Sequence, residues 1–463
     1  MAEALHSHRR HRCWLFRPLA GNIYLPALPV LENEFHASAT AINVTVSVFM
    51  LTFAVGPLFW ASFADWKGRR PLYIISISIY IVANVLLAAV PANYGALVFL
   101  RIVQAFGSAA VVSMGAGTVA DVTPPKERAF AMSIFLLGPQ LGPVLGPVIG
   151  GALTIASWRW IFGFLGKLSV EAHLIIHPLT EPNSHCRLCS LGRHYPDAAR
   201  DLACQGRKRQ TLRPSQLHPL SAQTIFASGS RVGKGPSPSQ ADSARILAPV
   251  QLPPIGIVTF NTAMLYSTYF AIAVQLPTEL ADRYNWSTAG IGAGFLAVGI
   301  AMIVGSMLGG ASPDNQVDPE NRLADQIWGV IVCAGGCAMY GWFVDASLHP
   351  AAVLVATFLT GFGMNWVFVA TTAFLTECVA QQAAGAFALG NMLRNPGAAI
   401  AALVIPSLVT KMGSGWCFTG LALLDLVLVG SAVIVLRIKS PGWRAARKAR
   451  MAAMAAAKPG GQK

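Results

Sequence analysis

The sequence predicts an all-α protein that crosses a membrane many times, for two reasons. Hydrophobic residues make up 54% of the 463 residues and charged residues only 12%, whereas soluble domains carry about 25% charged residues. The apolar residues also form long blocks without charges, and roughly 20 such residues cross a bilayer as a helix. We expect eleven membrane segments and a weaker candidate at 158–178; the eleven are 14–31, 42–64, 71–90, 96–120, 131–156, 254–278, 288–312, 327–344, 350–376, 383–408 and 414–436.

The distribution of basic residues orients these segments. The net charge is +14, from 34 Lys+Arg and 20 Asp+Glu. We exclude nucleic-acid binding, because the basic residues lie in short loops beside apolar segments, which is the positive-inside pattern. The pattern places the loop after 42–64, the loop after 96–120 and the C-terminal tail in the cytoplasm. The basic residues in these two loops and the tail are Lys67, Arg69, Arg70, Lys126, Arg128, Arg437, Lys439, Arg444, Arg447, Lys448 and Arg450.

Residues 138–151 combine two regularly spaced residue types inside a charge-free window from Ala129 to Ala156. Glycine and proline each recur at every fourth position, so each type forms one stripe along a helix. A glycine stripe lets a neighbouring helix approach backbone to backbone, and the prolines are expected to bend the helix. A kinked packing helix without a dynamic role is the alternative. The stripes consist of Gly138, Gly142, Gly146 and Gly150 and of Pro139, Pro143 and Pro147.

Two membrane segments end in a similar way, which indicates two related halves. Gly56 precedes Asp65 by nine residues at the end of one segment, and Gly305 precedes Asp314 by nine residues at the end of another. Internal repeats of this kind are typical of transporter folds. The second copy lacks the Gly-Arg-Arg that follows Asp65, so any gate there works differently.

These motifs, in this order, resemble those of the major facilitator superfamily and, within it, of the fungal drug:proton antiporter group. The resemblance covers residues 21–165 and 246–440. The sequence at 134–143 resembles that of family members in the branch that handles polyamine-like and dityrosine-like compounds. The resemblance implies two six-helix bundles around a central cavity, whereas charged residues interrupt the expected sixth helix of this chain. The motifs are Gly56-x8-Asp65-x2-Gly68-Arg69-Arg70, Arg101-Ile-Val-Gln104-Ala-Phe-Gly107, the Gly-Pro repeat, Tyr24-Leu-Pro26-Ala-Leu-Pro29 and Trp158-Arg-Trp-Ile-Phe162.

Arg101 is the outstanding charge inside a predicted membrane segment. A buried arginine needs a partner or a wet cavity, and Gln104 lies one helical turn on, facing the same way. Snorkelling of the side chain to the nearby interface is the alternative. The resemblance implies that an arginine at this position couples proton transfer to transport.

A second group of candidates lies at the cytoplasmic end of segment 42–64. Arg69 and Arg70 are expected to bind carbonyls or a carboxylate across the interface between the halves. Asp65 is expected to accept hydrogen bonds from a facing helix, and Asp121 is its candidate electrostatic partner. Positive-inside anchoring alone explains the arginines, but it does not explain Asp65 or Gly68.

Polar side chains inside the membrane segments mark a candidate substrate path, since transporter sites lie between repeats near the midplane. Each of these side chains is equally well explained as a helix–helix hydrogen bond. No acidic cluster singles out a site for a cation. The path candidates are Tyr24, Asn261, Tyr266, Tyr269, Asn365, Asn391 and Arg394.

Residues 166–245 do not resemble the family. Lys167 and Glu171 interrupt the expected sixth helix, and the Pro-, Ser- and Arg-rich stretch that follows is expected to be disordered. Wrong-frame translation, an unspliced intron or a lineage-specific loop would explain it. Cys186-x2-Cys189 is half a zinc motif without a flanking fold, so we expect no metal. The expected units are an N-terminal bundle at 1–165, the basic segment at 166–245, a C-terminal bundle at 246–440 and a basic cytoplasmic tail at 441–463.

The sequence thus favours a transporter that exports small organic molecules by proton antiport through alternating access. No phosphate-binding Gly-x4-Gly-Lys-Ser/Thr loop is present, so an ion gradient is the expected energy source. We expect no enzyme activity and no cofactor. The expected partners are a small-molecule substrate, protons and the lipid bilayer, and we expect a monomer in the plasma membrane rather than the vacuole. The alternatives are a defective gene product and a non-transporting receptor on the same scaffold.

Overall fold

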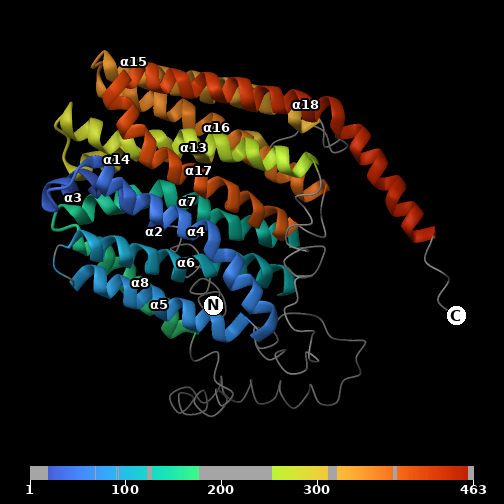
Figure 1. Cartoon of the computed structure of the whole chain (residues 1–463), viewed down its shortest axis with the longest axis horizontal. Coiled ribbons are helices and arrows are strands. Elements are labelled where there is room, and N and C mark those ends of the chain that lie inside the picture. The colour runs from blue at the N-terminus through green and yellow to red at the C-terminus, as the bar shows by residue number, and fades with distance from the viewer. Residues whose placement is uncertain are drawn as a thin grey trace, which may run out of the picture.

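Long helices, laid side by side, make up most of the described chain (Figure 1). The computed structural model describes residues 19–67, 69–89, 91, 93–122, 128–176, 253–310, 321–378 and 383–456. The first half contains α2 (Leu19–Asn22), η1 (Leu25–Ala27), α3 (Leu28–Glu34), α4 (Ala39–Lys67), α5 (Arg69–Ala89), α6 (Tyr94–Val122), α7 (Arg128–Thr154) and α8 (Arg159–Ile176). The second half contains α13 (Pro253–Asp282), α14 (Thr288–Gly310), α15 (Asn321–Asp345), α16 (Pro350–Cys378), α17 (Ala383–Met412) and α18 (Ser414–Ala456).

The first expected membrane segment, 14–31, is not one continuous helix. From Leu19 onward it consists of α2, the 3-10 turn η1 and α3, with Pro26 and Pro29 each in the first turn of a new element. Proline has no N–H to donate and fits the first turn of a helix, so the chain restarts at each proline. The side chains from Leu19 to Leu28 are buried by the surrounding helices.

Residues 159–176 form helix α8, so the weaker candidate at 158–178 is helical. The helix packs against α5 and keeps its charged side chains Lys167 and Glu171 exposed. It extends past residue 165, where we expected the N-terminal bundle to end. Residues 177–252, which contain most of the expected disordered segment, lie outside the described residues.

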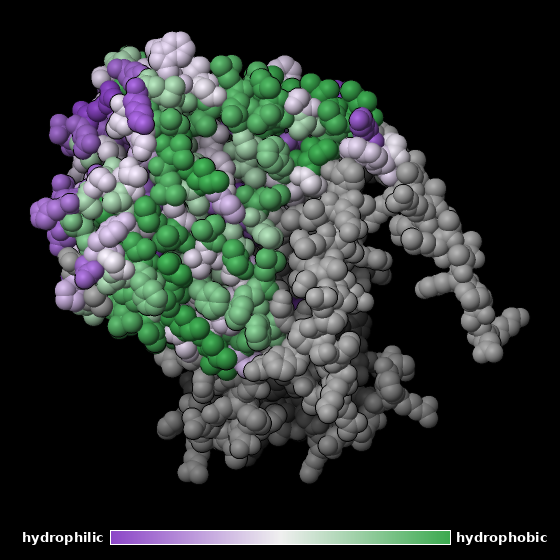
Figure 2. Space-filling model, in the orientation of Figure 1, coloured by the Kyte–Doolittle hydropathy of each residue, from purple (hydrophilic) through white to green (hydrophobic). Residues whose placement is uncertain are grey.

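The described helices have the length and composition of membrane spans. Nine of them are long and apolar enough to cross a membrane, and α7 adds a shorter apolar stretch at Leu141–Thr154. Large apolar side chains such as Phe99, Ile155 and Met307 are 64%, 68% and 71% exposed. Hydrophobic residues cover much of the face in Figure 2, while hydrophilic residues gather at one end. An apolar surface of this extent fits contact with lipid, and the all-α polytopic fold is therefore confirmed.

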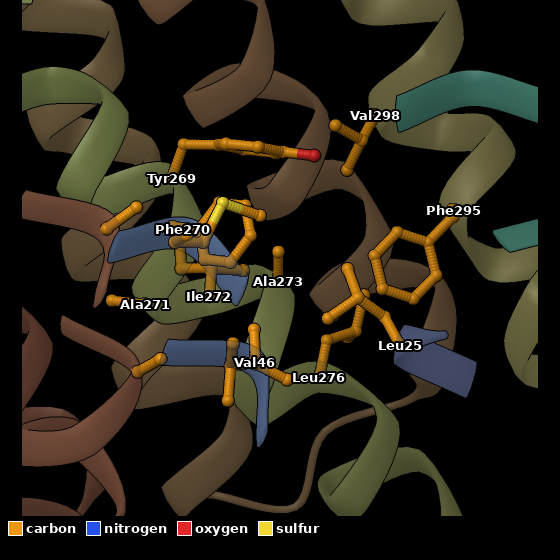
Figure 3. Packing of buried hydrophobic residues seen from close by; sticks show 14 of the residues in the cluster. Leu25, Val46, Tyr269, Phe270, Ala271, Ile272, Ala273, Leu276, Phe295 and Val298 are labelled. Carbon is orange, nitrogen blue, oxygen red and sulfur yellow. The ribbon is translucent and has the colours of Figure 1, made fainter. Parts of the chain in front are cut away.

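The two halves of the chain meet along two pairs of helices. Helix α7 packs against α14, and α4 packs against α17. The hydroxyl of Ser47 on α4 donates a hydrogen bond of 2.9 Å to the carbonyl of Ala399 on α17. In Figure 3, residues of α13 lie among Leu25, Val46 and Phe295, so one apolar core continues from the first half into the second.

Helix α18 continues beyond the expected end of the C-terminal bundle at 440. It has 43 residues and ends at Ala456, and its last part projects from the bundle in Figure 1. The expected tail at 441–463 is therefore helical as far as Ala456. Residues 457–463 lie outside the described residues.

The carboxyl of Glu32 lies on an element of the first half that contacts the second half. Glu32 follows the first expected membrane segment, on α3, which packs against α13. Burial, together with the charge of Asp282, raises the pKa of Glu32 to about 7. The protonated carboxyl is therefore the form that fits the packed state, and ionisation opposes the contact as pH rises through about 7.

We expect the ends of α3 and α13 to separate as pH is raised from 6 to 8. In the Glu32→Gln variant we expect these two helix ends to stay close together at both pH values. The measurement is the distance between spin labels at the exposed positions Asn33 and Asn285, in the full chain and in the variant. A distance that changes equally with pH in both proteins would contradict the assignment to Glu32.

Candidate functional site

Arg101 lies at the centre of a buried polar chain in the first half. Its side chain, on α6, is 0% exposed. The guanidinium donates a hydrogen bond of 2.8 Å to Gln104 Oε1, and Gln104 Nε2 donates one of 2.8 Å to Asn84 Oδ1 on α5. Snorkelling to the interface does not describe this side chain, because it is buried and bonded inward. Gln104 faces the same way as Arg101, as the helical spacing predicted, and the two side chains are hydrogen-bonded.

Two aromatic rings cover the same guanidinium. The rings of Tyr24 and Phe49 lie 4.2 and 4.4 Å from Arg101 Cζ. The Tyr24 hydroxyl accepts a hydrogen bond of 3.0 Å from Thr45. Arg101 Nε and one terminal nitrogen have no hydrogen-bond partner, and no carboxylate within the described residues pairs with this arginine. A buried cation without a counter-ion is costly unless rings and dipoles stabilise it, so the site favours an arriving negative charge.

The second half contains a similar arrangement around Arg394 on α17. Its guanidinium donates a hydrogen bond of 2.6 Å to Asn391 Oδ1, three residues earlier. The rings of Tyr266 on α13 and Phe368 on α16 lie 4.6 and 5.1 Å from Arg394 Cζ. In both halves an arginine is therefore held by an amide three positions away in its own helix and covered by two rings from other parts of the same half.

The remaining path candidates have different surroundings. Both side-chain polar atoms of Asn261 are buried without a partner, as is the hydroxyl of Tyr269, which points toward Val298 in Figure 3. Asn365 on α16 instead donates two hydrogen bonds to α14, to the carbonyl of Met302 and to Ser306 Oγ. Asn365 thus joins two helices.

The cytoplasmic motif is described only in part. Arg69 donates a hydrogen bond of 3.0 Å to the carbonyl of Met114. This bond joins α5 to α6 inside the first half, whereas we expected the motif to act across the halves. Gly68 and the side chains of Asp65, Arg70 and Asp121 lie outside the described residues.

The glycine stripe of α7 faces α2, as the expected close approach requires. A Cβ atom on Gly146 would lie 3.0 Å from the backbone nitrogen of Ile23 and 3.2 Å from the carbonyl carbon of Asn22. A Cβ atom on Gly150 would overlap the carbonyl oxygen of Ile23. Gly142, Pro143 and Pro147 are also buried in α7. Gly138 and Pro139 lie in the same helix, but their surroundings are outside the described residues. The proline-induced bend stays a prediction.

The contact with the second half includes Gly151, a residue that the glycine stripe did not include. A Cβ atom on Gly151 would overlap the carbonyl oxygen of Thr288 and lie 3.0 Å from Cα of Gly292 on α14. Conversely, a Cβ atom on Gly292 would lie 2.5 Å from the carbonyl oxygen of Pro147. The signal in the sequence was the doubled glycine at 150–151, together with the spaced glycines at 290, 292 and 294.

Sequence reasoning also missed Asn84, Phe49 and Phe368. Of these three residues only Asn84 could have been found from the sequence, because it is an amide inside an apolar segment. The two phenylalanines carried no signal, because nothing in an apolar run distinguishes a ring over a cation from a ring facing lipid.

Comparisons with known proteins show which family the chain belongs to. The family model described as Major Facilitator Superfamily matches residues 14–311. A Candida glabrata protein named multidrug transporter DTR1 is 39% identical over 444 residues, covering 90% of this chain and 81% of the relative. Dityrosine transporter 1 of Saccharomyces cerevisiae is 38% identical over 438 residues, covering 89% and 76%.

A third relative, with lower sequence identity, is named as an exporter of citrate. Citrate exporter 1 of Aspergillus niger is 26% identical over 478 residues, covering 95% of this chain and 86% of the relative. The names of the three relatives describe transporters or exporters, and those of the first two are consistent with the fungal drug:proton antiporter group that the motifs resemble. The chain therefore belongs to the major facilitator superfamily of membrane transporters.

Proposed function

We propose that this protein exports small organic molecules across its membrane by proton antiport. The observation that carries the proposal is Arg101, a fully buried arginine without a carboxylate partner among the described residues. The names of the relatives, a multidrug transporter and a dityrosine transporter, support export of small organic compounds.

Arg101 acts in this proposal through its charge. Gln104 and Asn84 fix the guanidinium from one side, and the two rings shield it from water. A fixed buried cation lowers the proton affinity of any acid that approaches it. The arrival or departure of a proton nearby is thereby linked to the state of the transporter.

Alternating access in this proposal uses the two helix pairs between the halves. Helices α7 and α14 meet through glycines, and α4 and α17 meet at the bond between Ser47 and Ala399. Backbone contacts of this kind are made or lost as a unit, because glycine has no side chain that can adapt. Under the orientation predicted from the basic loops, these contacts close the outer end.

The proposal also includes the domain organisation, oligomeric state and location that the sequence predicts. Residues 1–165, extended by α8, form the N-terminal bundle, and residues 246–440 form the C-terminal bundle. The basic part of 166–245 links the bundles, and 441–463 faces the cytoplasm. The protein works as a monomer in the plasma membrane, with Asp65, Gly68, Arg70 and Asp121 in the cytoplasmic gate.

Reconstitution of the purified full chain tests the proposal. Vesicles are loaded with one of three probes, a lipophilic cationic dye (rhodamine 6G), a polyamine (spermidine) or an aromatic carboxylate (N-acetyl-L-tyrosine), without ATP. We expect an inward proton gradient to accelerate efflux of at least one probe above that of protein-free vesicles. Binding of a probe without gradient-driven flux would instead indicate a receptor, and neither binding nor flux would indicate a defective product.

A further inference from the structure

Proton antiport needs a side chain that takes up a proton and releases it again. An arginine does not do this, because its guanidinium stays protonated at physiological pH. Two carboxyl side chains are buried within the described residues, those of Glu279 and Asp425. Glu279 forms an ion pair of 2.6 Å with Arg283 and accepts a hydrogen bond of 2.9 Å from Gln275, so its charge is compensated. Asp425 has no such partners.

Asp425 lies in the middle of a membrane span. It is on α18, 11 positions after Ser414 and 14 before Lys439, the two ends of the apolar stretch. About 16 Å of helix therefore separates it from the outer end. Its side chain is 0% exposed, and neither carboxyl oxygen makes a hydrogen bond of ordinary geometry or pairs with a Lys or Arg of the described chain. A buried, unpaired acid at this depth indicates a functional group.

Helices α13 and α15 enclose this carboxyl. Helix α18 runs beside α15 and also contacts α13 (Figure 1). Cys333 and Cys337 on α15 lie near enough to sense the charge of Asp425. Thr268 on α13 places its hydroxyl beside the carboxyl, outside ordinary hydrogen-bond geometry. Two thiols and one hydroxyl are weak partners for a full negative charge, so the packed seam between α13, α15 and α18 fits the neutral acid.

Other titratable groups near this seam do not compensate the carboxyl. Cys417, on α18 itself, interacts with Cys337. Helix α17 also contacts α18, but its arginine, Arg394, is held by Asn391. Among the described residues, Thr268 is therefore the side chain that is placed to stabilise an ionised Asp425.

Helix α13 connects this carboxyl to the rest of the transporter. It contacts η1 and α3 of the first half and packs along α17. Tyr266, two positions before Thr268, covers Arg394. A change of charge at Asp425 acts on α13 through Thr268, and so reaches both the contact between the halves and the second arginine.

The outer end of the seam is closed in this conformation. The backbone N–H groups of the first two residues of α18 donate hydrogen bonds of 3.1 and 2.7 Å to Asp345 on α15. The rings of Tyr340 and Phe418, with centroids 4.8 Å apart, pack between the same two helices. Under the orientation predicted from the basic loops, this end faces outward. Asp425 therefore exchanges no proton with the outside until these contacts open, as alternating access requires.

We propose that Asp425 carries the proton that is exchanged for the exported molecule, with Thr268 as a positioning residue. The inference rests on the proposed export function and assigns a residue to its proton. In each cycle a carboxylate oxygen binds a proton from the outer side, and the same O–H bond breaks when the proton leaves to the inner side. No electron is transferred. Ionisation leaves an unpartnered charge in the seam, so it favours a conformation in which water reaches the carboxyl.

Infrared spectroscopy of the purified full chain in vesicles tests the assignment without requiring transport. A protonated carboxyl has a C=O band that ionised carboxylates and thiols lack. We expect the spectrum of the wild type minus that of Asp425→Asn to contain this band at pH 6 and to lose it by pH 9. The matched control, wild type minus Glu34→Gln, removes an exposed carboxyl and should show no such change. Absence of a pH-dependent carboxyl band from the Asp425→Asn difference would overturn the proposal.

Transport by the same variant links the carboxyl to the exchanged proton. Asparagine has nearly the same shape as the neutral acid, so Asp425→Asn should still let a probe leave down its own gradient. We expect an inward proton gradient to accelerate efflux in the wild type and no longer to do so in Asp425→Asn. Acceleration that survives in this variant would overturn the proposal. A pH-dependent Asp425 band in a wild type without gradient-driven flux would count against the proposed export function alone.

A second pair of variants leaves the carboxyl in place. Thr268→Val keeps the branched shape but removes the hydroxyl that favours the ionised form, so the Asp425 band should persist to higher pH. Thr268→Ser keeps the hydroxyl and should match the wild type. A band that fades at the same pH in Thr268→Val as in the wild type would overturn the positioning role of Thr268.

Discussion

Gly151→Leu is expected to stop turnover while leaving substrate binding intact. Even a Cβ atom at this position would overlap the carbonyl oxygen of Thr288 and approach Cα of Gly292 to 3.0 Å. A leucine adds further atoms in the same direction, so the closed contact between α7 and α14 cannot form. The protein should be held with its outer end open, and net transport should fall to the level of protein-free vesicles.

The measurement combines transport with the accessibility of single cysteines placed at the two ends of the interface. Gly335→Leu is the matched control, because a Cβ atom on this glycine of α15 would meet nothing within 4 Å. Gly146→Leu provides a contrast, since that residue faces Ile23 in its own half and its substitution should mainly lower stability. Normal turnover in Gly151→Leu would contradict the role assigned to this interface.

Arg101→Ala is expected to abolish proton-coupled efflux in a protein that still inserts and folds. The substitution removes the buried charge and leaves Gln104 Oε1 without its donor, at a cost of about 1–3 kcal/mol in stability. Loss of coupling should appear as an efflux rate that no longer responds to an imposed pH gradient. The assay is efflux at two values of external pH, alongside a thermal melt of the purified protein.

Gln104→Ala and Arg101→Lys separate charge from geometry. The first keeps the arginine and removes the amide that orients it, and the second keeps a charge but loses the planar contact with Tyr24 and Phe49. Both should reduce the pH response without eliminating it. If efflux and its pH dependence survive in Arg101→Ala, the arginine is a structural element only.

The fold was predictable from the sequence because hydrophobicity over about 20 residues is a one-dimensional signal. The expected segments correspond to α2 through α7 and to α13 through α18. The break in the first segment was not predicted, although Pro26 and Pro29 were visible. Hydropathy does not report where a buried helix restarts.

The site was predictable where one residue type is unusual in its setting. Arg101, Gln104 and Arg394 are conspicuous as polar groups in apolar segments, and the structure places Arg101 with Gln104 and Arg394 with Asn391. The pairing of Gly151 with Gly292 joins two segments 141 positions apart. No local pattern specifies which face of α7 meets α14, so this contact required the three-dimensional arrangement.

Proton movement during transport tests the central claim most directly. Vesicles containing the full chain and a pH-sensitive dye are loaded with whichever probe is exported, and the probe is then allowed to leave down its own gradient. The account predicts that the interior acidifies as the probe leaves, and that this acidification is absent with Arg101→Ala and in protein-free vesicles. Equally fast efflux of the probe with no change in internal pH would contradict proton antiport.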